Sequence, residues 1–187
     1  ASHHGDLCFR DGKIFVAVNL GQFNQPAGKA DSWVYVYDAE TLAELARHPV
    51  PELVHGAGGI AQHDGRFIII GGLPEGMDEN YLYEYDANFA FQKRHVLPSG
   101  YTKMGIQTAA YANGSWWFGC YGSPAKLLRA DVKFQLTGQW KFDAAVGIVG
   151  LRDGQFLIGH NTKNKDASNS GRIAIGRADS KNGLVLE

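Results

Sequence analysis

The sequence predicts an all-β protein made of four tandem copies of a four-stranded antiparallel unit, because one turn signal recurs between apolar runs. The clearest copy begins at His55. There the dipeptide Asp64-Gly65 separates the small and apolar residues 58–61 from the apolar residues 67–70. Both turn residues tolerate the positive φ of a tight type I′ turn, so this pattern indicates a β-hairpin.

The rest of this copy supplies two more strands. Residues 81–85 alternate tyrosine with leucine and glutamate, which is the period-2 pattern of a strand with two different faces. Residues 86–88 form a second turn signal, and residues 89–96 read as a further strand. One unit is therefore expected to be a four-stranded meander.

The same unit recurs along the whole chain. The first turn signal is found at Asp11-Gly12, Asp64-Gly65, Asn113-Gly114 and Asp153-Gly154. A second signal, between the third and fourth strands, is found at Asp38, Asp86, Asp131 and Asp179. The units span residues 1–53, 54–100, 101–143 and 144–187, close to the roughly 40 to 50 residues of a propeller blade. We expect residues 1–187 to form a single β-propeller domain or a fragment of one.

Closure of the ring is open at this level. The first unit begins with its innermost strand and the fourth ends with its outermost, whereas propellers usually complete one blade from both termini. Either four blades close by side-chain packing, or they belong to a larger ring of five or six blades. The sequence favours the larger ring.

Two stretches of the second unit carry a resemblance to a known family. GRFIIIGG at residues 65–72 and YLYEYD at residues 81–86 resemble the kelch repeat, and SWVYVYDAETL at residues 32–42 is similar. Only the second unit has the double glycine, and Trp140 alone lies near the tryptophan position of the last kelch strand. The chain is also similar to five- and six-bladed propellers that include calcium-dependent lactonases and glutaminyl cyclotransferase-like proteins.

Composition excludes several partners. A formal net charge of −1, a pI near 6.7 and the lack of any Lys/Arg cluster argue against nucleic acid. No apolar run approaches the roughly 20 residues that cross a bilayer, so no membrane role is expected. Cys8 and Cys120 fall in different units and are expected to be free thiols. Cellular location stays open; the soluble chain would be extracytoplasmic if a signal peptide had been removed.

The repeat also predicts where function lies. In a propeller the first turn signals mark one face, which we call the turn face. The opposite face, the loop face, carries the starts of the inner strands and the loops between second and third strands. These loops are residues 19–31, 72–80, 121–124 and 160–171. They vary in length while the strands repeat, as expected where a scaffold presents a site on loops.

Polar and aromatic residues at the loop face are the candidate ligand contacts, and a small molecule, a glycan or a protein is the expected partner. They are His55, Gln107, His160, Asn161, Asn19 and Tyr121. A channel-side polar residue binds a ligand in one interpretation and satisfies a backbone group in the other. The first hypothesis is a binding protein without chemistry of its own.

A metal site at the central channel is the alternative. His4, Asp6 and His55 could supply nitrogen and oxygen to Ca²⁺ or Zn²⁺. A metal-dependent hydrolase or lactonase would then use Asp6, His55, Gln107 and Asn161. Ca²⁺ usually takes several carboxylates, and the inner strand starts supply only Asp6, which weighs against this hypothesis.

Overall fold

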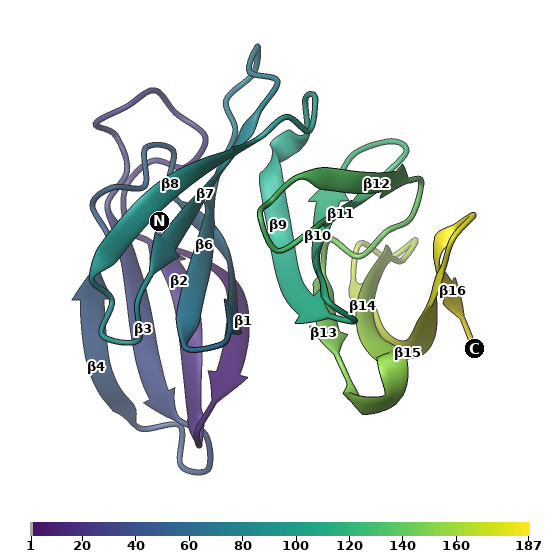
Figure 1. The fold of residues 1–187 in the computed structure, drawn as a ribbon, viewed down its shortest axis with the longest axis horizontal. Coiled ribbons are helices and arrows are strands. Elements are labelled where there is room, and N and C mark those ends of the chain that lie inside the picture. Colours follow the sequence, from purple (N-terminus) through teal and green to yellow (C-terminus); the bar gives the residue numbers. More distant parts are fainter. Residues whose placement is uncertain (1) are drawn as a thin grey trace.

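The computed structural model describes residues 2–187 and is a four-bladed β-propeller of four four-stranded antiparallel sheets (Figure 1). The predicted fold class is therefore confirmed. Residue 1, which the first predicted unit includes, lies outside the described residues. Over residues 2–187 the structure has no helix with the length and apolarity needed to span a membrane.

Each blade is a meander whose strands neighbour one another in chain order from the centre outwards. Blade 1 contains β1 (His3–Arg10), β2 (Lys13–Asn19), β3 (Ser32–Asp38) and β4 (Glu44–Pro49). Blade 2 contains β5 (Ala57–His63), β6 (Arg66–Gly71), β7 (Asn80–Tyr85) and β8 (Phe91–Leu97). Blade 3 contains β9 (Lys103–Ala112), β10 (Ser115–Tyr121), β11 (Lys126–Ala130) and β12 (Leu136–Trp140). Blade 4 contains β13 (Gly147–Gly150), the 3-10 turn η1 (Arg152–Gly154), β14 (Gln155–Lys163), β15 (Asn169–Asp179) and β16 (Gly183–Leu186).

The two recurrent turn signals act through different physics. At the first signal, the Asp or Asn has φ between 50° and 64° and the following glycine has φ between 71° and 76° in all four blades. These are the left-handed conformations that a type I′ turn requires. At the second signal, Oδ1 of each aspartate accepts hydrogen bonds from two backbone N–H groups two to four residues later: Asp38, Asp86, Asp131 and Asp179.

The fourth inner hairpin departs from the repeat. Leu151 N donates to Gln155 O at 2.8 Å, and Gly150 rather than Leu151 pairs with Phe156. This turn is thus one residue longer than the others, and a one-residue change of register exchanges the two faces of a strand. Ile148 consequently packs against blade 3, while Val149 faces away from it.

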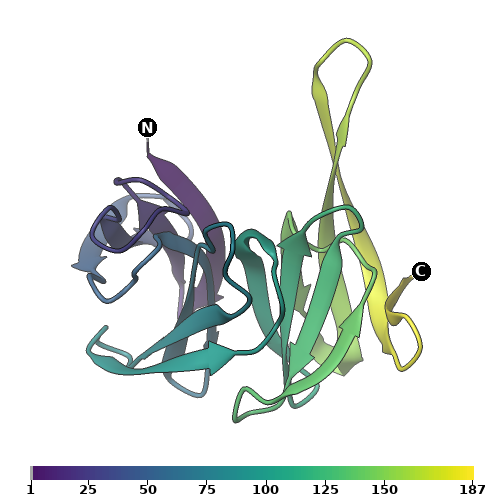
Figure 2. The ribbon, with the colours of Figure 1, turned by 90° about the horizontal axis from the view of Figure 1, so that it is seen from above.

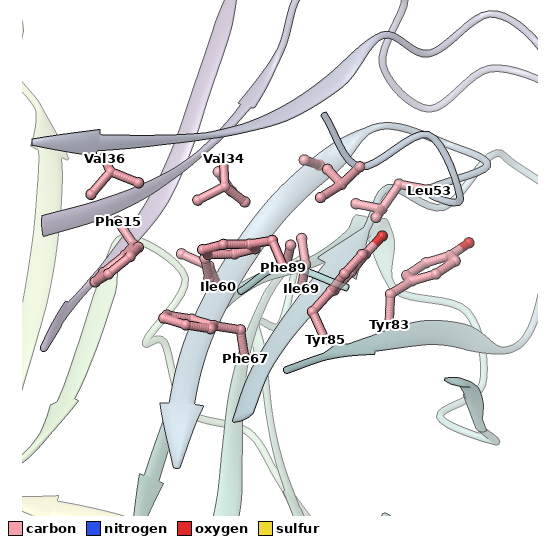
Figure 3. Packing of buried hydrophobic residues seen from close by; sticks show 13 residues of the cluster. Phe15, Val34, Val36, Leu53, Ile60, Phe67, Ile69, Tyr83, Tyr85 and Phe89 are labelled. Carbon is pink, nitrogen blue, oxygen red and sulfur yellow. The ribbon is translucent and has the colours of Figure 1, made fainter. Parts of the chain in front are cut away.

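Buried apolar clusters join successive blades. One cluster lies between blades 1 and 2, a second between blades 2 and 3, and a third between blades 3 and 4. In the first, Phe15 and Val34 of blade 1 meet Ile60, Phe67 and Tyr85 of blade 2 (Figure 3). Dispersion and hydrophobic burial between neighbouring sheets therefore hold the blades together. Cys8 and Cys120 are free thiols that lie at the first and second of these interfaces.

Near the propeller axis the inner strands of neighbouring blades approach one another closely, because glycines lie where these strands meet. A Cβ on Gly5 of β1 would overlap the carbonyl oxygen of Gly58 in β5. A Cβ on Gly59 would lie 3.3 Å from the backbone oxygen of Gln107 in β9. These positions allow backbone-to-backbone packing that a side chain would prevent.

Asp6 spans the axis between three blades. Its Oδ2 accepts a hydrogen bond from the N–H of Ala109 in β9 at 2.9 Å, and the N–H groups of Leu7 and Ile60 also stabilise the carboxylate. Burial dominates over these bonds and raises the pKa of Asp6 to about 7. The residue as a whole keeps partial exposure, yet protein atoms closely surround its carboxyl group.

Gly5→Ala tests the close strand contact. The new methyl group has to displace the Gly58 backbone, so we expect the free energy of unfolding to fall by roughly 2–4 kcal/mol in urea denaturation. Gly171→Ala is the matched control, because the nearest atom to its Cβ is 4.0 Å away. Equal stabilities of the two variants would contradict the axial packing.

Asp6→Asn tests the buried carboxyl. Because the folded pKa lies above the ordinary value of 3.8, its stabilising contribution is complete below about pH 4 and is lost as pH rises through about 7. The asparagine variant stays neutral, so its stability relative to the original protein should rise by roughly 2–4 kcal/mol between these pH values in urea denaturation. Asp11→Asn, at an exposed turn, should show no such change; a parallel pH profile for Asp6→Asn would refute the assignment.

Candidate functional site

A cavity of about 1130 Å³ opens on the loop face. It lies between the second-to-third-strand loops of blades 1, 2 and 3 and the segment that links blades 2 and 3. Its lining residues are Asn24, Gln25, Pro26, Leu73, Pro74, Glu75, Tyr101, Lys103, Met104, Tyr121, Gly122, Ser123, Pro124 and Lys126. Three of the four loops expected to carry function therefore meet at one hollow.

The lining combines two aromatic rings with short polar groups and charges. Tyr101 and Tyr121 are 39% and 37% exposed, which leaves ring surface open to a ligand. Asn24, Gln25 and Ser123 offer amide and hydroxyl groups. The charged lining residues are Glu75, Lys103 and Lys126, and the Lys126 Nζ donates to the Tyr101 carbonyl oxygen at 2.8 Å.

Blade 1 reaches this cavity through a loop that is fastened to blade 2. Asn24 N donates to the His55 carbonyl oxygen at 3.0 Å, and Asn24 Oδ1 accepts from Leu73 N at 3.0 Å. His55 Nδ1 lies 2.8 Å from the carbonyl oxygen of Gln25. A carbonyl oxygen can only accept, so Nδ1 of His55 carries the hydrogen. The wall formed by Asn24 and Gln25 is thus held by backbone and buried side-chain bonds.

Three of the residues predicted as ligand contacts do not line the cavity but hydrogen-bond to backbone groups near it. Asn19 is fully buried; its Nδ2 donates to Gly21 O and its Oδ1 accepts from Asp31 N, both at 3.0 Å. His55 is buried, bonded to Gln25 as above, and its ring stacks beside Tyr81. Gln107 Nε2 donates to the carbonyl oxygens of Met104 and Gly105 at 2.9 and 3.2 Å.

The other predicted ligand residues are divided. Tyr121 lines the cavity. His160 and Asn161 lie inside strand β14, because the expected loop 160–171 is mostly a hairpin in which β14 and β15 pair as far as Lys163 and Asn169. Figure 2 shows this hairpin projecting beyond the blades. The turn at its tip is stabilised by Asp166 Oδ1, which accepts from the N–H and hydroxyl of Ser168.

The predicted metal ligands are not gathered. Among residues 2–187 no group of three or more His, Cys, Asp or Glu side chains is placed to hold a metal ion, so His4, Asp6 and His55 do not form one. His4 lies edge-on to Tyr35 at 6.4 Å, Asp6 bonds to Ala109, and His55 bonds to Gln25. The three side chains belong to separate local structures.

Sequence reasoning located the loops but missed most of the lining residues. Lys103 and Met104 precede a predicted inner strand, which is a signal for the loop face. Tyr101 and Lys126 carry no such signal, because one lies in the link between blades and the other begins the third strand of blade 3. Glu75 lies in a predicted functional loop, where nothing distinguishes it from the neighbouring acidic residues 78 and 79.

The chain is similar in fold to parts of longer solved proteins. A GH43 β-1,3-galactosidase crystallised with galactodeoxynojirimycin has 15% identity and a TM-score of 0.66, with 99% of this chain and 75% of that chain covered. A GH130 structure, described with glycoside hydrolases that target β-1,2-mannosidic linkages in Candida mannan, has 10% identity and a TM-score of 0.61, covering 98% and 69%.

A GH43 endo-arabinanase from Bacillus licheniformis has 14% identity and a TM-score of 0.56, with 96% of this chain and 72% of that chain covered. No family model and no curated protein matches the sequence. At these identities the likeness establishes the propeller fold alone. The propeller part of the expected resemblance is confirmed, while these three neighbours are carbohydrate-active proteins rather than kelch or lactonase proteins.

Asn19→Ala distinguishes support from ligand contact. Loss of its buried hydrogen bonds should lower the free energy of unfolding by roughly 1–3 kcal/mol and speed hydrogen exchange in residues 20–31. Asn88→Ala, at an exposed turn, is the control. A stable Asn19→Ala protein with unchanged exchange would show that the side chain does not hold the loop.

Proposed function

We propose that the loop-face cavity binds carbohydrate, either as a free oligosaccharide or as part of a glycan. The observation that carries the proposal is the pair of exposed tyrosines, Tyr101 and Tyr121, beside amide, hydroxyl and charged side chains in one hollow. Sugars present an apolar C–H face that packs on an aromatic ring, and a rim of hydroxyl groups that exchange hydrogen bonds with polar side chains.

The fixed wall formed by Asn24 and Gln25 favours carbohydrate binding. Asn24 and Gln25 are fixed by their bonds to blade 2, so the wall is ordered before a ligand arrives. A preorganised wall reduces the conformational entropy lost on binding. Solved neighbours that act on galactosides, mannosides and arabinan agree with a carbohydrate ligand, although the shared feature is the fold and the proposal rests on the lining residues.

Cleavage of a glycoside is the second candidate, favoured by Glu75 in the cavity. Most glycoside hydrolases use two carboxyl groups that flank the scissile bond. Within residues 2–187 the cavity lining contains one carboxyl group, that of Glu75. Binding is therefore the function that these residues support best, and cleavage needs a second acid. The metal-dependent hydrolase or lactonase, with Ca²⁺ or Zn²⁺ at the channel, stays a prediction.

Titration calorimetry with β-1,2-mannobiose, an arabinan oligosaccharide and β-1,3-galactobiose tests the proposal. At least one sugar should bind, and Tyr101→Ala or Tyr121→Ala should weaken its affinity by roughly 10-fold, since aromatic packing contributes about 1 kcal/mol beyond area burial. Phe91→Ala removes a ring of similar exposure, 40%, outside the cavity and should leave binding unchanged.

The outcomes separate the two candidates. Absence of binding by all three sugars, or equal affinity in the tyrosine variants, would reject the carbohydrate proposal. Release of reducing sugar that disappears in Glu75→Gln, with binding retained, would establish cleavage instead of binding alone.

A further inference from the structure

The outward sheet faces of the two end blades carry exposed apolar side chains. On blade 1, Leu7 and Phe9 are 52% and 60% exposed; on blade 4, Val149 and Ile173 are 50% and 75% exposed. Strand pairing places Leu7 in a row with Val16 and Tyr35, on the face opposite to the cluster shared with blade 2. Single exposed apolar side chains are ordinary, but several gathered on one sheet face indicate an interface.

The interface between blades 1 and 2 shows how a blade of this protein contacts the blade that precedes it. Tyr83 and Tyr85 of β7 are both 1% exposed and lie at the boundary with blade 1. Tyr85 donates its hydroxyl hydrogen to Glu52 Oε2 at 2.8 Å, and the Tyr83 hydroxyl accepts from Val54 N at 3.2 Å. Both partners belong to the segment that links the preceding blade to this one.

Blade 1 repeats the same surface without the same partners. Tyr35 pairs with Val16 and Tyr37 with Ile14, as Tyr83 and Tyr85 pair with Ile69 and Phe67, so the two tyrosine pairs are equivalent in register. Within residues 2–187 neither the Tyr35 nor the Tyr37 hydroxyl makes a hydrogen bond. The Arg47 guanidinium lies over the Tyr35 ring, 4.5 Å from its centroid.

The exposed apolar residues of blades 1 and 4 also border a cavity at the propeller axis. A cavity of about 290 Å³ lies between the inner strands of all four blades, and its lining includes Leu7, Phe9 and Val149. The exposed apolar residues of blades 1 and 4 thus extend inwards to a hollow at the centre. In Figure 2 these two blades, which carry the N- and C-terminal ends of the chain, stand at the two ends of the series of blades.

We propose that a fifth four-stranded blade packs between blade 4 and blade 1. Both faces of this blade are apolar. The segment that links it to β1 presents a backbone N–H to the Tyr35 hydroxyl and a carboxylate to the Tyr37 hydroxyl. All three existing interfaces are apolar clusters between successive sheets, and that between blades 1 and 2 also has the tyrosine-to-link bonds, so the occupant continues an interface that the molecule already uses. The solved neighbours, of which this chain spans 69–75%, extend beyond the matched part.

A second copy of the chain fits these observations less well. A two-fold interface would bring like faces together, whereas blade-to-blade packing joins the two unlike sides of successive sheets. Of the two end blades, only blade 1 carries a tyrosine pair in the register that receives a linking segment in blade 2. The fifth blade is independent of the proposed carbohydrate function.

An extended chain tests the proposal. A copy of residues 50–100, which begins with a natural link between blades, is added after Glu187. The thermal midpoint should rise by roughly 5 °C or more, and backbone amides of β1 and β15 should gain protection from hydrogen exchange. The same extension with Phe9→Lys and Ile173→Lys is the control, and neither gain should appear in it.

A tyrosine variant gives a second readout. Tyr37→Phe should leave the thermal midpoint of the 187-residue protein unchanged. It should lower that of a protein in which a copy of residues 1–53, which ends in the natural link, is placed before residue 1, while Tyr85→Phe should lower both. The proposal is overturned if extensions with residues 50–100 and with residues 97–143 both leave β1 and β15 unprotected. It is also overturned if the 187-residue protein is a stable dimer in which Ile173 is protected.

Discussion

Direct packing of backbone on backbone at the axis is the constraint on which the rest of the propeller depends. Gly5 lies against Gly58, and Gly59 lies against Gln107, so the inner strands of blades 1, 2 and 3 approach more closely than strands with side chains could. This spacing determines how the outer strands diverge and how large the wedge between neighbouring sheets becomes. Apolar side chains then fill each wedge, as Phe15 and Phe67 do between blades 1 and 2. The hydrophobic clusters supply most of the stabilisation, but the glycines set the geometry in which they form.

The loop face follows from the same geometry. Because the inner strands converge, the loops of blades 1, 2 and 3 are brought side by side, and the polar groups beneath them are buried. Buried polar groups need partners, which explains why Asn19 and His55 bond to loop backbone rather than project into the cavity. The half-buried Gln107 bonds to the backbone of its own strand, β9. The residues that a ligand can reach, such as Tyr101 and Tyr121, stand one layer further out. How deeply a residue lies in the fold therefore decides whether it supports a loop or can contact a ligand.

Much of the architecture could be predicted from sequence. The four Asp-Gly or Asn-Gly turns require positive φ, a local property that a dipeptide reveals, and the tyrosine alternation of residues 81–85 reveals a strand with two faces. The site was harder to predict from sequence. A pattern of period two shows on which side of a strand a residue lies, but not which neighbouring loop covers it. His55 and Asn19 were thus predicted as ligand contacts from correct positions at the loop face. The sequence predicts a loop where β14 and β15 extend into a hairpin, because residues 161–171 are polar on both sides and carry no apolar alternation.

The Asp6–Ala109 hydrogen bond joins residues 103 positions apart in sequence. A nascent chain emerges from the ribosome from its N-terminus, so blade 1 can form its own hairpins long before β9 has been synthesised. The Asp6 carboxyl then has no partner in β9 until the rest of blade 1 and all of blade 2 have been synthesised. Closing a loop of this length costs conformational entropy that local hairpins do not incur. Blade 1 can therefore reach its final arrangement at the axis only after β9 has been made, and its apolar inner edge is exposed throughout that interval to other chains and to chaperones.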